Sequence, residues 1–253
     1  MHRSLKKPYI GIAGITSRQQ VETILSYGIN HAERPVMIGV LASSKTLSGR
    51  TNKYPHRTPP IDAIKTIFGD DPGVINFVHY HSEDADTLAQ QLDLVSTLSG
   101  NCLDGFQINN AWPSSSELWC HRIKYPHHRI VLQLNKAVLS NDTAEAIAKK
   151  LKRRYLDVVQ YVLIDASGGL GSLLDTTKTL DLITAIQEHV PEIKIAVAGG
   201  LGPDTLSRLE PLIVQYPELS IDAESGVRDP VTDLLDLDRT ESYLRKAVVL
   251  LMR

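Results

Sequence analysis

The sequence predicts a single-domain α/β protein, a closed (β/α)8 barrel that covers residues 1–253. Three observations support this. The length of 253 residues is close to the roughly 250 typical of such a barrel. Short apolar runs alternate with amphipathic segments along the whole chain. Two glycine-rich segments near the C-terminus, 198–204 and 224–229, each follow an apolar run. Continuously apolar strands indicate a parallel sheet buried on both faces, and about eight repeats favour a closed barrel over an open doubly wound sheet.

The first half of the chain contains four of these units. Strands are expected at 9–13, 35–42, 74–80 and 105–109, and helices around 18–28, 61–68 and 88–100. Ser17 can cap the first helix because Gln20 follows three residues later, as in a capping box, and Gly28 is a natural stop. A long polar loop, 43–60, follows the second strand, and Pro59 suits the first turn of the next helix.

The second half repeats the pattern. Strands are expected at 129–134, 158–164, 194–197 and 219–223, and helices at 114–123, 144–151 and 180–186, from Pro203, and up to Met252. The helix at 144–151 illustrates the basis of these assignments, because its apolar residues recur at the spacing of one helical face. No linker or low-complexity segment divides the chain, so one domain is expected.

Composition narrows the class of protein. Hydrophobic residues make up 42% and charged residues 22%, which is ordinary for a soluble globular protein. The formal net charge of −2 argues against nucleic-acid or acidic-lipid partners. No apolar stretch approaches the roughly 20 residues of a membrane span, and no long apolar segment follows the basic N-terminus. Cys102 and Cys120 lack metal-site spacing. We therefore expect a cytoplasmic enzyme or binding protein, monomeric or homodimeric, without metal.

Titratable residues at the carboxyl ends of the strands are the candidate catalytic groups, because barrel active sites lie there. Asp165 ends the sixth apolar run, where it could act as a general acid or brace the following loop. His79 and His81 lie near the end of the third strand. Their spacing places both on the same strand face, and His81 could serve as a base. Packing or surface roles are the alternative for both histidines.

The glycine-rich segments are candidate phosphate sites. Backbone N–H groups of Gly199, Gly200, Ser225 and Gly226 could converge on one phosphate, as the last two loops of such barrels often do. Gly169, in a third glycine-rich segment after Asp165, could fold over the ligand. The alternative is that these glycines only relieve crowding at the rim. A phosphorylated small molecule is thus the expected partner.

Arg50 is the candidate for binding a substrate carboxylate. It lies in the long loop after the second strand, and a guanidinium can donate two parallel hydrogen bonds to a carboxylate. Lys45 and Arg57 are rivals in the same loop, and a solvated, exposed arginine is an equal alternative.

Four segments together resemble one enzyme family. They are Ile10-Gly11-Ile12-Ala13-Gly14-Ile15-Thr16, Leu163-Ile164-Asp165, Ala198-Gly199-Gly200-Leu201-Gly202-Pro203 and Ile221-Asp222-Ala223-Glu224-Ser225-Gly226-Val227. In order and spacing they are similar to the motifs of phosphoribosylanthranilate isomerases, barrels of tryptophan biosynthesis that need no cofactor. The resemblance implies an Amadori rearrangement of N-(5-phosphoribosyl)anthranilate, with Asp165 as acid. It also implies phosphate contacts at Gly199-Gly200 and Ser225-Gly226, and Arg50 near the anthranilate carboxylate.

The chain departs from this family where the base is expected. Ala13 occupies the position of the family's general-base cysteine, and a methyl group cannot accept a proton. Asn109 replaces a family histidine, and Glu224 directly precedes the phosphate-binding serine. Several outcomes stay open: Asp165 performs both proton transfers, His81 replaces the cysteine, or the barrel serves another phosphorylated sugar. The chain could also bind such a sugar without turning it over.

Overall fold

Eight runs of buried residues form the strands of a closed, all-parallel barrel in the order β1 to β8, which confirms the predicted (β/α)8 fold. The computed structural model describes residues 7–29, 33–165 and 175–252. The strands are β1 (Ile10–Ala13), β2 (Val36–Ser43), β3 (Val74–His81), β4 (Gly105–Ile108), β5 (Arg129–Leu134), β6 (Tyr161–Asp165), β7 (Lys194–Ala198) and β8 (Ser220–Ala223). Pairing of β1 with both β2 and β8 closes the barrel.

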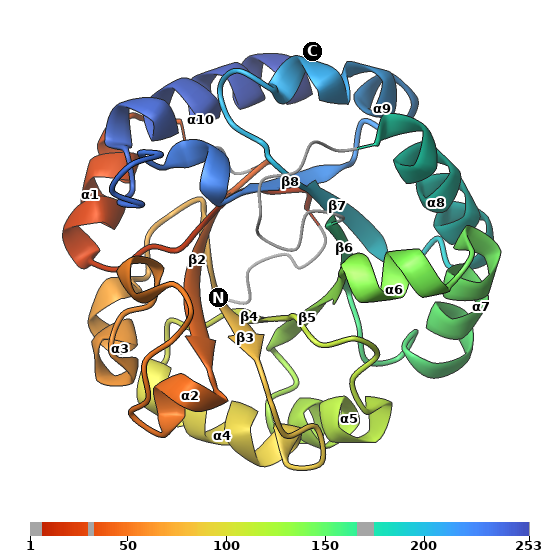
Figure 1. Cartoon of the computed structure of the whole chain (residues 1–253), viewed down its shortest axis with the longest axis horizontal. Helices are drawn as coiled ribbons and strands as arrows, with labels where there is room; N and C mark the ends of the chain where they lie inside the picture. Colours follow the sequence, from red (N-terminus) through yellow and green to blue (C-terminus); the bar gives the residue numbers. More distant parts are fainter. Residues whose placement is uncertain (1–6, 30–32, 166–174, 253) are drawn as a thin grey trace.

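Helices surround the strands as an outer ring (Figure 1). In the described ranges they are α1 (Arg18–Ser26), α2 (Ser44–Leu47), α3 (Ile64–Ile67), α4 (Leu88–Ser99), α5 (Ser115–Lys124), α6 (Lys136–Asn141), α7 (Ala144–Arg154), α8 (Thr176–His189), α9 (Glu210–Gln215) and α10 (Leu237–Leu251). Short 3-10 turns lie at η1 (Pro55–Arg57), η2 (Ile61–Ala63), η3 (Leu206–Leu209) and η4 (Ser225–Val227). None of these helices combines the length and apolar character that crossing a membrane requires.

Two apolar layers hold the barrel together because successive side chains of a strand point to opposite faces. A large layer lies between the strands and the helices. A smaller cluster fills the barrel interior, where the Tyr9 ring meets Phe77 edge to face at 6.2 Å and Tyr161 at 5.6 Å. These aromatic rings fill the barrel interior near the amino ends of the strands.

Local sequence signals explain most of the element boundaries. The expected capping box at the start of α1 is present. The Ser17 hydroxyl accepts from the Gln20 backbone N–H, and the Gln20 side-chain oxygen accepts from the Ser17 backbone N–H. The segment 43–60, expected as a loop, also contains α2, because Ser43 and Thr46 form a second capping box. α6 was not expected from the sequence, and Asn135 caps it.

Two helix expectations need correction. The helix expected over 61–68 is split into η2 and α3. The helix expected from Pro203 begins only at η3 and α9. Thr205 explains the delay, because its hydroxyl donates to the Gly200 carbonyl oxygen at 2.8 Å and accepts from the Gly202 N–H at 2.9 Å. These two bonds hold the chain in a tight turn beside the end of β7.

Candidate functional site

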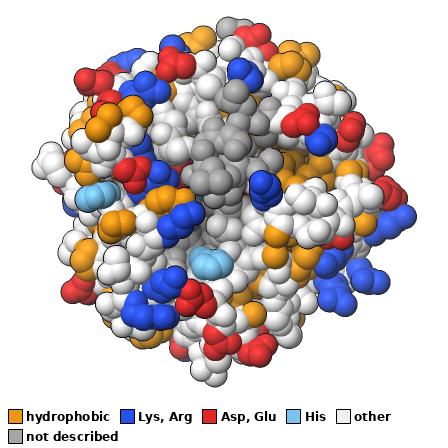
Figure 2. Space-filling view, viewed as in Figure 1, with side chains coloured by type: hydrophobic (Ala, Val, Ile, Leu, Met, Phe, Trp, Pro, Cys, Tyr) orange, Lys and Arg blue, Asp and Glu red, His pale blue; other side chains and the backbone are white. Residues whose placement is uncertain are grey.

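A cavity of about 570 Å³ opens at the carboxyl ends of β2 to β8. Its wall includes residues from the end of each of these strands, which is where the fold places active sites. On the face shown in Figure 2, basic, acidic and histidine side chains are mixed around the centre. Strand β1 contributes no residue to the lining, and Ala13 at its end is only 1% exposed.

Two carboxyl groups and an imidazole lie at the buried floor of this cavity. Asp165 ends β6, Asp222 lies within β8, and His79 lies within β3; all three line the cavity and are less than 9% exposed. The His79 Nε2 is 4.0 Å from the Asp222 Oδ2. Three titratable groups therefore lie on the buried floor of one cavity.

A chain of side-chain amides leads to Asp165. The Gln133 Nε2 donates to the Asp165 Oδ2 at 2.7 Å, and the Gln107 Nε2 donates to the Gln133 Oε1 at 3.3 Å. Because a carboxylate oxygen accepts at one end, the orientation of both amides follows from Asp165. Among the described residues, nothing donates to the buried Gln107 Oε1. That buried oxygen is therefore left without a donor in the described part of the chain.

Burial disfavours the charged form of both Asp222 and His79. Desolvation, followed by the charges of Glu224 and Asp165, raises the pKa of Asp222 well above its usual value. Desolvation lowers the pKa of His79 to about 3. Neither the Asp222 Oδ1 nor the His79 Nε2 has a hydrogen-bond partner within the described part of the chain. Such buried, unpaired polar atoms are costly and recur at functional sites.

Gly39 makes room for the His79 ring. A Cβ atom at position 39 would lie 2.7 Å from the His79 Nε2 and 3.1 Å from the Cα of Ala13. The imidazole therefore crosses over β2 towards the end of β1. It lies beside the position where the sequence lacks a thiol.

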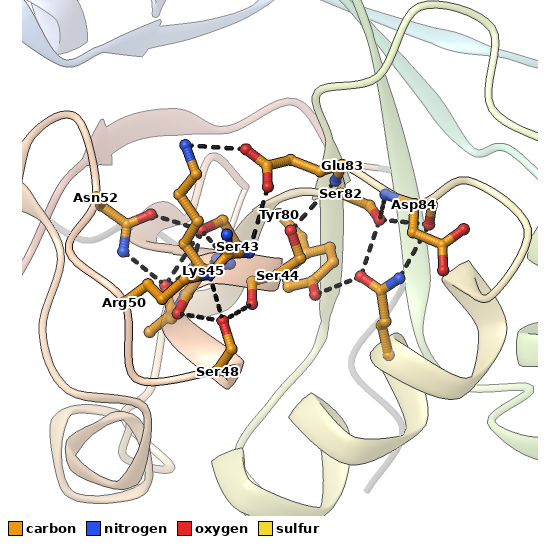
Figure 3. Close-up of polar contacts among 12 residues, drawn as sticks. Ser43, Ser44, Lys45, Ser48, Arg50, Asn52, Tyr80, Ser82, Glu83 and Asp84 are labelled. Carbon is orange, nitrogen blue, oxygen red and sulfur yellow. Dashed lines mark hydrogen bonds and ion pairs between the residues drawn. The ribbon is translucent and has the colours of Figure 1, made fainter.

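The loops after β2 and β3 form a polar rim that meets at Glu83 (Figure 3). The Lys45 Nζ contacts one Glu83 oxygen at 2.9 Å, and an Arg50 guanidinium nitrogen contacts the other at 3.3 Å. The Glu83 backbone N–H donates to the Ser44 hydroxyl. Lys45 lines the cavity, whereas Arg50 is largely exposed and lies outside the lining. The structure thus brings Lys45, rather than Arg50, to the cavity wall.

Arg57, the remaining candidate cation of this segment, links the loop after β2 to the loop after β8. It is 6% exposed and donates to Glu224 through Nη1 at 2.6 Å and to Asp233 through Nε and Nη2. Glu224 lines the cavity next to Ser225. Its charge is therefore compensated by a buried guanidinium, which weakens the repulsion that Glu224 would exert on a phosphate at Ser225.

The expected phosphate-site residues occupy two kinds of position. Gly199 and Ser225 line the cavity, and Gly200 and Gly226 do not. Gly199 and Gly200 have positive φ angles of 117° and 61°. A methyl group on Gly226 would overlap the Leu201 carbonyl oxygen, so this glycine permits backbone-to-backbone packing of the last two loops. Gly169 lies outside the described residues.

The remaining sequence candidates also reach the cavity. His81 lines its outer part, is exposed, and its Nδ1 lies 2.7 Å from the Asn109 carbonyl oxygen. Asn109 lines the cavity as well, and its side chain accepts from Asn135. No group of three or more metal-binding side chains occurs in the described ranges.

Sequence reasoning missed Asp222, Gln133 and the buried position of His79. The signal for Asp222 was present, because an acidic residue is the penultimate residue of the expected strand 219–223. A carboxyl group inside a buried strand must be paired or neutral, and it therefore marks a candidate site.

Comparison with known proteins gives the fold and no family. No protein-family model matches the sequence, and no curated protein is similar to it. Among solved structures, the chain is similar to phosphoribosylanthranilate isomerase from Thermotoga maritima, at a TM-score of 0.63 and 16% identity, covering 96% of this chain and 100% of that one. The chain is also similar to a phosphoribosylanthranilate isomerase in complex with reduced 1-(o-carboxyphenylamino)-1-deoxyribulose 5-phosphate. The TM-score is 0.62 and the identity 15%, and the match covers 96% of this chain and 100% of that one. Tryptophan synthase from M. tuberculosis is similar at a TM-score of 0.56 and 12% identity, and the match covers 97% of this chain and 92% of that one.

Proposed function

We propose that this protein is an acid–base isomerase that converts a phosphorylated aldosylamine, such as N-(5-phosphoribosyl)anthranilate, into the corresponding amino-ketose. The observation that carries the proposal is the convergence of Asp165 and Asp222 on the floor of one cavity, beside His79. An Amadori rearrangement needs a group that protonates the ring oxygen and a group that removes the proton from C2. Two carboxyl groups in one desolvated site can divide these roles.

The substrate class is supported by the cavity wall. Gly199 and Ser225 come from the two loops that bind phosphate in many barrels of this fold, and they lie on one side of the cavity. Lys45, on the β2 side, offers a cation for a second anionic group such as a carboxylate. The similarity in fold to two isomerase structures agrees with this assignment.

A non-catalytic phosphosugar-binding barrel is the second candidate, and the observation that favours it is Ala13. The residue is buried and carries no group that could accept a proton. A binding protein would be stabilised by the sugar phosphate through mass action and would release no product.

The deciding experiment follows the loss of phosphoribosylanthranilate fluorescence with purified protein. Asp165→Asn and Asp222→Asn serve as active-site variants, and Asp204→Asn, at an exposed position outside the cavity lining, serves as a matched control. The isomerase proposal expects turnover that falls steeply in both cavity variants and that the control keeps. Absence of turnover at high enzyme concentration, together with stabilisation by ribose 5-phosphate, would replace it with the binding function.

A further inference from the structure

We propose that Asp222 is the proton donor of this site and Asp165 its ionised proton acceptor. The opposite role for Asp165 was expected from the sequence resemblance. This inference rests on the proposed isomerase function for its substrate, and on the geometry of the ligand-free cavity for the location of the proton. It would explain how the site dispenses with a thiol at Ala13.

Hydrogen bonding distinguishes the two carboxyl groups. Asp165 accepts a 2.7 Å bond from the Gln133 amide, which stabilises a negative charge. Asp222 receives no side-chain donor within the described residues: its Oδ1 is unpaired, and its Oδ2 is 4.0 Å from the His79 Nε2. Two neighbouring carboxyl groups in a buried site favour retaining one proton between them. The carboxyl group without a side-chain donor is the one that keeps it.

The packing around Asp222 supports the same assignment. A Cβ on Gly11 of β1 would lie 2.6 Å from the Asp222 Oδ1, so the carboxyl group is pressed against the backbone of β1 and away from water. Burial and the charges of Glu224 and Asp165 raise its pKa, while the Ala223 N–H opposes this shift. A charge on Asp222 would therefore be poorly stabilised.

The other titratable groups that face Asp222 do not reverse this. His79, from β3, stays neutral because burial lowers its pKa. Tyr9, before β1, and Tyr243, from α10, have raised pKa values and are neutral too. Glu224, farther along the β8 segment, is paired with Arg57. No cation therefore reaches Asp222 in the described structure to draw off its proton.

The proton movements balance over one cycle. Asp222 gives its proton to the ring oxygen, the C1–O bond breaks, and an iminium forms at C1. Asp165 removes the proton from C2. The electron pair of the broken C2–H bond forms the C1=C2 bond, and the C=N π electrons move to nitrogen, which becomes neutral. The enol hydroxyl then returns a proton to Asp222 as the C2 carbonyl forms. The proton held by Asp165 passes to C1, and both groups regain their starting states.

The first test measures where the proton lies, without substrate. Protein labelled with ¹³C at the aspartate carboxyl carbons is titrated by NMR between pH 5 and 8, and the signals are assigned with Asp222→Asn and Asp165→Asn. We expect a carboxyl signal at the protonated position at pH 7 that disappears in Asp222→Asn, and an ionised signal that disappears in Asp165→Asn. An ionised Asp222, or a protonated Asp165, would overturn the proposal. Because asparagine is neutral and isosteric with a protonated aspartate, Asp222→Asn is expected to fold.

The second test assigns the roles during turnover and is separable from the first. Residual activity of each variant is measured with N-(5-phosphoribosyl)anthranilate carrying hydrogen or deuterium at C2 of the ribose. Asp165→Asn should show a primary isotope effect larger than that of the wild type, because removal of the C2 proton becomes limiting. Asp222→Asn should show an isotope effect near unity, because ring opening becomes limiting. The reversed pattern of isotope effects would contradict our assignment of the two roles. If the wild type does not turn over this substrate, the proposed function is wrong, and the NMR result still locates the proton.

Discussion

Two buried histidines, His121 on α5 and His128 directly before β5, should make the free energy of unfolding depend on pH. Substitution of His128 can isolate its share of that dependence. His128 is 5% exposed and stacks on Tyr125 at 4.8 Å, and its Nδ1 lies 3.2 Å from the His121 Nε2. Burial and the charges of His121 and His127 lower the pKa of His128 to about 3. An unfolded histidine titrates near 6.5. The unfolded state therefore binds the extra proton first, and stability falls as the pH falls below about 6.5.

The magnitude follows from linkage. Each pH unit between the two pKa values is worth about 1.4 kcal/mol, so this one residue should remove about 2.5 kcal/mol of unfolding free energy between pH 7 and pH 4.5. His128→Phe preserves the stacking and removes the titration. It also removes the bond to His121, which shifts the whole stability curve without changing the slope contributed by residue 128.

The assay is urea unfolding of the wild type and His128→Phe at several pH values from 7 to 4.5. The free-energy difference between them should move by about 2.5 kcal/mol in favour of the variant as the pH falls. His127→Phe is the matched control, because His127 is adjacent and exposed. Parallel curves for His128→Phe and the wild type would show that residue 128 is not held neutral by the fold, and would refute the reasoning.

Three further substitutions test packing and pairing. Gly226→Ala should cost about 1–3 kcal/mol, because its methyl group meets the Leu201 carbonyl oxygen. Thermal unfolding should show this loss, and an unchanged melting temperature would contradict the loop contact. Arg57→Met should lower the free energy of unfolding by about 2 kcal/mol, because Glu224 and Asp233 lose their cation. Arg50→Met, at an exposed position, should change it by less than about 0.5 kcal/mol, and similar values for the two variants in chemical unfolding would refute this. Tyr9→Phe should leave the free energy of unfolding unchanged or raised, since the Tyr9 hydroxyl lacks a partner in the described structure. Tyr161→Phe should lower it by about 1 kcal/mol, because the bond to the Lys7 carbonyl oxygen is lost, and the reverse order in urea unfolding would be inconsistent with these contacts.

The architecture was predictable because strand and helix periods are local properties of the sequence. The run Arg129–Leu134 coincides with β5, and the Ser17 capping box begins α1 as expected. Short helices were harder to predict. α6 has six residues and α2 has four, too few for an apolar period to be visible, and both depend on a capping side chain.

The candidate site was predictable in its location and less so in its details. Fold geometry alone places Asp165 and the ends of β7 and β8 at one rim. The choice between Arg50 and its rivals was not accessible, because it depends on how 43–60 folds around Glu83 and Asp233. The same holds for His79, whose inward position depends on space above a glycine on the neighbouring strand.

The close approach of the His79 ring to Gly39 ties two positions on different strands to each other. Any side chain at position 39 would occupy the volume of the imidazole, so position 39 can enlarge only if position 79 shrinks or turns away. Among natural relatives of this chain the two positions should therefore vary as a pair. In a directed-evolution library that aims to move a thiol or a carboxylate to the end of β1, codons 13, 39 and 79 should be randomised together, because changing any one alone searches a space that its neighbours already fill.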